Sequence, residues 1–71
     1  HIDEIAMREL LVDAMDRITE REQQVLALYY FEGLTLSQIG EIIGVTESRV
    51  SQIHSKAILT LRSHIERAGA A

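Results

Sequence analysis

Residues 35–62, TLSQIGEIIGVTESRVSQIHSKAILTLR, predict two helices joined by a tight corner. Apolar residues recur over 36–43 at spacings of three and four, which places them on one face of a helix. Thr35 precedes that helix as an N-cap, and Gln38 lies three residues later, where its side chain completes a capping box. The first helix of the corner is therefore expected over residues 36–43.

Two glycines mark the corner itself. Gly44 follows the first helix, where the chain needs a residue that tolerates positive φ, and Thr46 then offers a second N-cap. Gly40 lies inside the first helix, where glycine costs about 1 kcal/mol relative to alanine, so we expect a close crossing of the two helices there. A long second helix is expected over residues 47–67. Its apolar stripe consists of Val50, Ile53, Ala57, Leu61 and Ile65.

Two further helices are expected before the corner, over residues 4–16 and 20–31. Thr19 and Glu22 form another capping box at the start of the second of these. Because that helix is apolar over most of its circumference, we expect it to be the central helix of the domain. Its three aromatic residues, which we assign to the core rather than to base stacking, are Tyr29, Tyr30 and Phe31.

The composition agrees with one all-α domain over residues 1–71, built from four helices with a C-terminal helix-turn-helix. Hydrophobic residues make up 46% of the chain but aromatic residues only 4%, so the core must consist mainly of aliphatic side chains. Proline is absent, and no stretch alternates with the period of two that a half-buried strand requires. The chain begins with His1 rather than methionine, so we expect it to be part of a longer protein.

Several classes of protein are not expected from this sequence. The absence of cysteine excludes disulfides and thiolate metal sites, and no apolar run is long enough for a membrane span or a signal peptide, so a cytoplasmic protein is expected. His54 and His64 lie on different sides of their helix and cannot share a metal. The serines near His54 lack an orienting acid in a pocket, so we expect no enzyme, cofactor, metal or small-molecule substrate.

The charge is unevenly distributed along the chain. The net charge of −4 has the wrong sign for a protein that binds DNA alone, because such affinity depends on neutralising phosphates. Residues 1–45 carry a net charge of −6, whereas residues 46–71 carry +2. The positive part is the long second helix, so we expect weak and salt-sensitive DNA binding unless a larger assembly supplies additional affinity.

Polar side chains lie on that helix opposite its apolar stripe. When each residue turns the helix by about 100°, Ser48, Gln52 and Ser55 fall on the outward side. The flanking residues are Arg49 and Lys56 on one side and Ser51 and Arg62 on the other. Cations beside a polar strip suit a DNA major groove, since the strip can reach base edges while the cations reach phosphates. Gln52 is the best single base reader, because its amide can pair with adenine in bidentate fashion.

Other functions remain open from the residues alone. Any amphipathic helix has polar residues opposite its apolar stripe, and Leu59 lies on the polar side, where it either packs on the first helix or marks a protein contact. The apolar and acidic residues 1–45 could therefore form a protein-interaction module with DNA contact secondary. A response-regulator output domain also uses such a corner, but it usually needs a dimerising surface, and none is identifiable. A salt titration separates groove binding from apolar contact, because only the former falls steeply with salt.

The string ITEREQQVLALYYFEGLTLSQIGEIIGVTESRVSQIHSKAILTLR, residues 18–62, resembles region 4 of bacterial sigma factors. The most specific parts are TEREQQVL, LTLSQIGEIIGVTESRVSQIHSKA and the closing LR, which are most similar to alternative sigma factors of the flagellar and sporulation type. This resemblance implies that the domain recognises the upstream (minus-35) promoter element during transcription initiation. It also implies docking on the β flap of the RNA polymerase core and occlusion by an anti-sigma factor.

The resemblance also assigns residues. Base contacts are expected at the start of the second helix of the corner, from Glu47, Ser48, Ser51 and Gln52. The expected backbone contacts are Arg21, Thr35, Thr46, Arg49, Ser55 and Lys56. Primary sigma factors carry a basic-then-acidic pair where this chain has Glu47 and Ser48. An arginine contact to guanine is unavailable at that point, so a different promoter sequence is expected.

Overall fold

The computed structural model describes residues 4–70, and the side chains of these residues except those of Met7, Gly69 and Ala70. It contains the four helices that the sequence predicts, and no strand within the described range. They are α1 (Glu4–Met15), α2 (Glu20–Tyr30), α3 (Leu36–Ile43) and α4 (Glu47–Ala70). The fold is therefore all-α, with α3 and α4 forming the helix-turn-helix.

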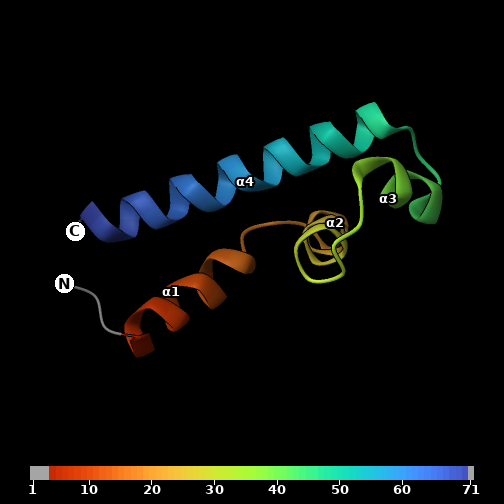
Figure 1. The fold of residues 1–71 in the computed structure, drawn as a ribbon. Coiled ribbons are helices and arrows are strands. Elements are labelled where there is room, and N and C mark those ends of the chain that lie inside the picture. Colours follow the sequence, from red (N-terminus) through yellow and green to blue (C-terminus); the bar gives the residue numbers. More distant parts are fainter. Residues whose placement is uncertain (1–3, 71) are drawn as a thin grey trace.

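The long helix α4 spans the whole length of the molecule, as Figure 1 shows. α1 lies beside its C-terminal half, α2 crosses near its middle, and α3 lies beside its first turns (Figure 1). α4 continues to Ala70, three residues beyond the expected end at 67. α1 and α2 each end one residue earlier than expected, within the usual uncertainty of helix ends.

The expectation that the second helix is the central one is wrong. α4 packs on all three other helices. At the C-terminal end of α2, Tyr30 is 56% exposed, and Phe31, which follows the helix, is 86% exposed. An apolar side chain is buried only where another element covers it, and helical periodicity does not reveal which side of a helix will be covered.

Two groups of buried side chains hold the helices together. One group joins α2, α3 and α4, and its members are Val25, Ile39, Val50 and Ile53. The other anchors the chain after α1 to α2 and α4, and its members are Ile18, Leu26 and Ala57. The first group fixes the angle between the two helices of the corner, and so sets which side of α4 faces solvent.

The corner closes through the backbone of α3. Gly44 adopts φ +76°, as the sequence predicts, and its N–H donates to the Gly40 carbonyl at 2.8 Å. The N–H of Val45 donates to the same carbonyl at 2.9 Å. A Cβ on Gly40 would lie 2.6 Å from the Val45 carbonyl oxygen. The closest approach is therefore to the turn, and the same Cβ would lie 3.5 Å from the backbone nitrogen of Glu47, so the first residue of α4 also packs close to Gly40 as expected.

The predicted capping boxes are present. The Thr35 hydroxyl accepts from the Gln38 N–H at 3.1 Å, and the Gln38 amide oxygen accepts from the Thr35 N–H at 2.9 Å. Thr19 and Glu22 make the same reciprocal pair at the start of α2. Thr46 caps α4 by accepting from the Arg49 N–H at 3.1 Å. The starts of three helices are thus set by local sequence.

Candidate nucleic-acid interface

The polar face of α4 is turned to solvent. Val50 and Ala57 have no exposed surface, and Ile53 is buried between them. Every residue that the sequence assigns to base or backbone contact is exposed, namely Arg21, Thr35, Thr46, Glu47, Ser48, Arg49, Ser51, Gln52, Ser55 and Lys56. The first turns of α4 therefore present small polar side chains outward on a rigidly packed helix.

The three cations in this set line one hollow between the start of α2 and the first half of α4. We call it the cationic hollow; its lining residues are Thr19, Arg21, Glu22, Arg49, Gln52, Ile53 and Lys56. It brings Arg21 from a distant part of the sequence beside Arg49 and Lys56 on α4. Gln52 is also part of its wall, so the residue expected to read a base lies next to residues expected to contact phosphates.

No cation of this hollow forms an ion pair within 4.0 Å among the described residues, although the Glu22 carboxylate lines the same hollow. Glu22 is 6% exposed, and its Oε1 accepts the Thr19 N–H at 2.8 Å, so this carboxylate belongs to the helix cap. Among the described residues, the one contact within 4.0 Å between a basic and an acidic side chain is His64–Asp13, on the far half of α4. Arg21 also lies in the first turn of α2, where the helix dipole disfavours a cation and favours an anion. The hollow is thus suited to receive a negatively charged group.

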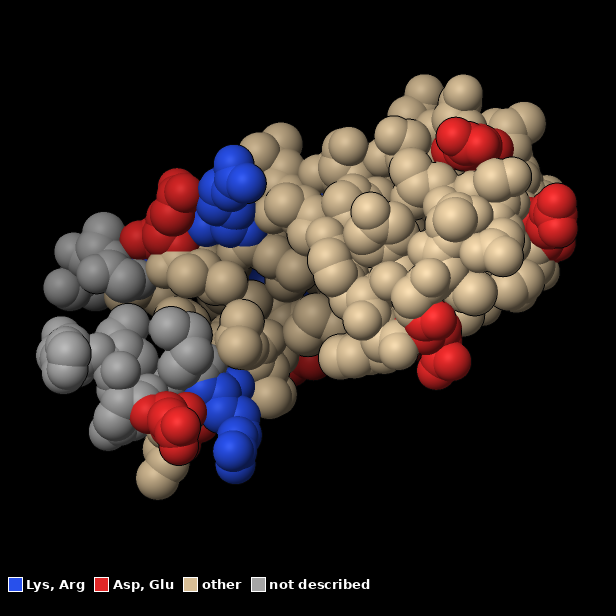
Figure 2. Space-filling view, in the orientation of Figure 1, with Lys and Arg blue, Asp and Glu red and all other residues tan. Residues whose placement is uncertain are grey.

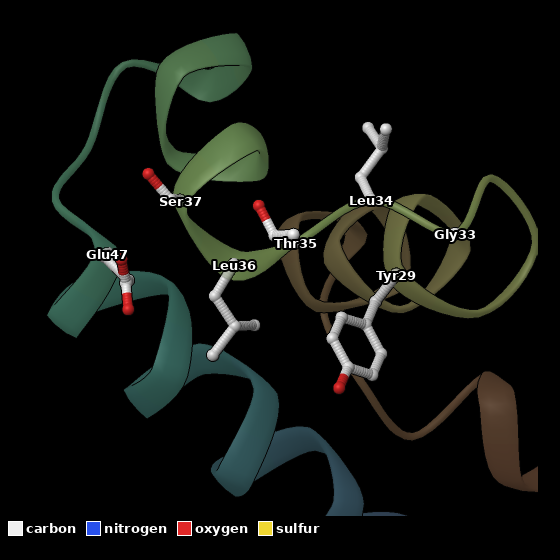
Figure 3. A pocket seen from close by; sticks show the side chains of 7 residues that line it. All are labelled: Tyr29, Gly33, Leu34, Thr35, Leu36, Ser37 and Glu47. Atoms are coloured by element: carbon white, nitrogen blue, oxygen red, sulfur yellow. The ribbon is translucent and has the colours of Figure 1, made fainter.

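Thr35 and Glu47 border a second hollow, at the start of both helices of the corner. Figure 3 shows the side chains of Tyr29 and Leu36 in the space between α2, α3 and α4, with Glu47 across from them. Its only charged lining residue is Glu47, so it lacks the cations of the first hollow. The hydroxyls of Thr35 and Thr46 act as hydrogen-bond acceptors in their caps, which leaves each O–H free to donate.

Ser55 lies apart from the cationic hollow. It borders a third hollow with His54, Ile58, Leu59 and Arg62, on another side of α4. Leu59 is 62% exposed and lies in this hollow, so it does not pack on α1. The structure thus places Ser55 beside Leu59, apart from the expected contact residues Arg49, Gln52 and Lys56 that line the cationic hollow.

Sequence reasoning missed several contacts that depend on the packing of α4. The Tyr30 hydroxyl lies 2.9 Å from His54 Nε2, and the two rings stack with centroids 5.7 Å apart. Because 24 residues separate them, no local sequence pattern indicates this contact. Thr19 and Glu22 were recognised as a cap, but nothing in the sequence placed them beside Arg49. These contacts fix α4 against α2 on either side of the polar face.

One part of the molecular surface in Figure 2 shows no cations. In Figure 2, no lysine or arginine is visible over α2, α3 and the start of α4, where isolated acidic side chains lie at the edges. The cations in this view lie toward the end that carries both termini (Figure 2). The exposed large apolar residues are Ile5, Leu11, Val12, Tyr29, Tyr30, Phe31, Ile42 and Leu59. Most of them lie on α1, α2 and α3, so these helices offer apolar side chains for contact with another protein.

The structure describes residues 4–70 and shows neither a metal site nor a membrane span within them. No three histidine, cysteine, aspartate or glutamate side chains there gather in a way that could hold a metal ion. No helix of residues 4–70 has the length and apolarity needed to cross a membrane.

The whole corner, with the helix before it, falls within one known sequence family. The model of "Sigma-70, region 4" matches residues 14–63, which include α2, α3 and most of α4. The chain belongs to the sigma-70 region 4 family. This confirms the assignment drawn from the TEREQQVL and LTLSQIGEIIGVTESRVSQIHSKA strings.

Curated relatives agree with this region 4 assignment. The chain is 54% identical over 55 residues to RNA polymerase sigma factor FliA of Pseudomonas aeruginosa, covering 78% of this chain and 22% of the relative. It is 46% identical over 65 residues to FliA of Yersinia enterocolitica, covering 92% of this chain and 28% of that relative. RNA polymerase sigma-D factor of Bacillus subtilis is 42% identical over 57 residues, covering 80% and 22%. The chain thus spans about a quarter of the length of these sigma factors.

Proposed function

We propose that this region 4 domain recognises the upstream promoter element as the C-terminal domain of an alternative sigma factor of the flagellar type. α4 enters the major groove with its first turns, so that Ser48, Ser51 and Gln52 face base edges and Glu47 lies at the entry. The relatives named FliA and sigma-D support this proposal, since both are RNA polymerase sigma factors by name. The protein then acts in the cytoplasm, by binding and without catalysis.

The observation that carries this proposal is the cationic hollow beside Gln52. A helix in the major groove needs positive groups at the sugar-phosphate wall, on the flank of its base-reading strip. Arg21, Arg49 and Lys56 provide them from two helices, without a carboxylate partner among the described residues. The Thr35 and Thr46 hydroxyls, together with free amides at the starts of α3 and α4, offer further donors to phosphates.

The acidic half of the chain has a different role in this proposal. Residues 1–45 carry −6, which disfavours DNA, and the apolar side chains exposed on α1, α2 and α3 suit protein contact. The β flap of RNA polymerase docks on this surface and supplies the affinity that a domain of net charge −4 lacks. An anti-sigma factor that covers the same surface competes with the polymerase.

The test uses the natural protein that contains these residues, reconstituted with RNA polymerase core. Lys56→Met removes one cation of the hollow, and we expect it to weaken equilibrium binding to promoter DNA and to lower the salt dependence by about one phosphate contact. Arg67→Met is the matched control, because Arg67 is an exposed cation of the same helix about 16 Å further along its axis. If both variants bind like the parent protein, the hollow does not contact DNA and the proposal fails.

A further inference from the structure

A hydrogen bond links two residues that the proposed function treats as separate. Arg49 Nη1 donates to Gln52 Oε1 at 3.4 Å, across one turn of α4. Because a guanidinium only donates hydrogen bonds, the bond requires the amide oxygen to face Arg49 and turns the Nε2 group away from it. This long bond between two exposed side chains favours one amide orientation of Gln52 before any DNA is bound.

The backbone of Arg49 belongs to the capped start of α4, because its N–H donates to the Thr46 hydroxyl at 3.1 Å. Its side chain borders the cationic hollow with Lys56, and no carboxylate among the described residues draws the guanidinium away. A guanidinium has five N–H donors, so the bond to Gln52 leaves others for a phosphate.

We propose that Arg49 is a positioning residue that joins a backbone phosphate to Gln52 and so decides what Gln52 reads. This inference rests on the proposed promoter recognition. A glutamine amide that nothing holds can present either its oxygen or its NH₂ group to a base, and it discriminates poorly. With Oε1 held by Arg49, the NH₂ group faces the groove and selects a base edge that carries an acceptor.

The base preference follows from the groove pattern. Adenine N7, guanine N7 and O6, and thymine O4 are acceptors, whereas cytosine presents the N4 donor. Cytosine offers no acceptor to Nε2 in the major groove, so it forms fewer bonds with Gln52 and is disfavoured. Adenine is favoured most, because the second lone pair of Oε1 can still accept from adenine N6 while Nε2 donates to N7.

The chain offers a matched control for this role. Lys56 borders the same hollow as Arg49 and carries the same charge, but no hydrogen bond joins it to Gln52 within the described structure. Both side chains are exposed, so removing either leaves the buried side of α4 intact. A cation that contacts only phosphate contributes equally to every sequence, whereas a positioning residue contributes to discrimination between bases.

The experiment measures binding of the reconstituted holoenzyme to a promoter series in which each base pair of the upstream element is replaced in turn. Gln52→Ala first identifies the base pair that this residue reads, where we expect the parent protein to discriminate by about five- to 100-fold. Lys56→Met should weaken binding to all sequences alike and keep that ratio. Arg49→Met should weaken binding similarly and reduce the ratio at this one base pair to within about threefold.

Each alternative result has a distinct meaning. If Arg49→Met keeps the full ratio, as Lys56→Met does, Arg49 contacts only phosphate and the positioning role is refuted. If Gln52→Ala changes no preference while Lys56→Met weakens binding, the hollow serves DNA but Gln52 reads no base, so this inference alone fails. If none of the three substitutions affects binding, the proposed function fails as well.

Discussion

Replacing Gly40 by alanine tests whether the corner is held by a close approach of two backbones. The added Cβ would lie 2.6 Å from the Val45 carbonyl oxygen, so the turn must move by about 0.8 Å to reach an ordinary contact of 3.4 Å. The turn resists that movement, because the Gly44 and Val45 N–H groups both donate to the Gly40 carbonyl. Overpacking of this kind costs about 1–3 kcal/mol, whereas alanine gains about 1 kcal/mol in helix propensity.

The expected result of Gly40→Ala is therefore a net loss of about 1 kcal/mol, or a fall in melting temperature of roughly 4–8 °C for a domain of this size. Urea unfolding followed by circular dichroism measures it. Ser37→Ala is the matched control, since Ser37 is exposed in the same helix and its replacement should leave stability unchanged or slightly raised. If Gly40→Ala raises stability by about 1 kcal/mol, helix propensity alone governs the position and the close approach is unimportant.

Further predictions concern the caps, the core and the ion pair. Thr35→Ala should lower the free energy of unfolding by about 1 kcal/mol. Thr35→Ser keeps the cap to Gln38 and should leave that free energy unchanged, so equal losses in both variants would contradict the capping role. Ile39→Ala removes a side chain with no exposed surface and should cost about 2–5 kcal/mol in the same unfolding assay, so a loss below 1 kcal/mol would refute its place in the core. Asp13→Ala breaks the contact with His64 but should lower the free energy of unfolding by less than about 1 kcal/mol, because the Asp13 side chain is 60% exposed. A larger loss would show that this pair anchors α1.

The features that the sequence predicted well are those set by local chemistry. The capping boxes at Thr19 and Thr35 need only a hydroxyl and an amide or carboxylate three residues apart, and Gly44 is required by positive φ. The outward side of α4 followed from the period of its apolar stripe, because Val50 and Ala57 lie on that stripe and are fully buried. Such features depend on neighbours within one or two turns of helix.

The features that escaped prediction depend on how the helices cross. Arg21 reaches the hollow beside Arg49 only because α2 packs against the middle of α4, and no sequence period encodes that arrangement. The exposure of Tyr30 and Phe31 also depends on how the helices cross. An apolar side chain can be covered by another helix of the same chain or by another protein, and the sequence does not show which. Ser55 and Lys56 border different hollows, although the two residues are adjacent in sequence.

The central claim is that the first turns of α4 lie in the groove of promoter DNA. A DNA-cleaving reagent tethered to a cysteine at position 51, in place of the exposed Ser51, measures this directly in the holoenzyme–promoter complex. The account predicts strand cleavage within the upstream element from this position, and none there from a cysteine that replaces Arg8 on α1. Cleavage of the element from position 8 but not from position 51 would contradict it.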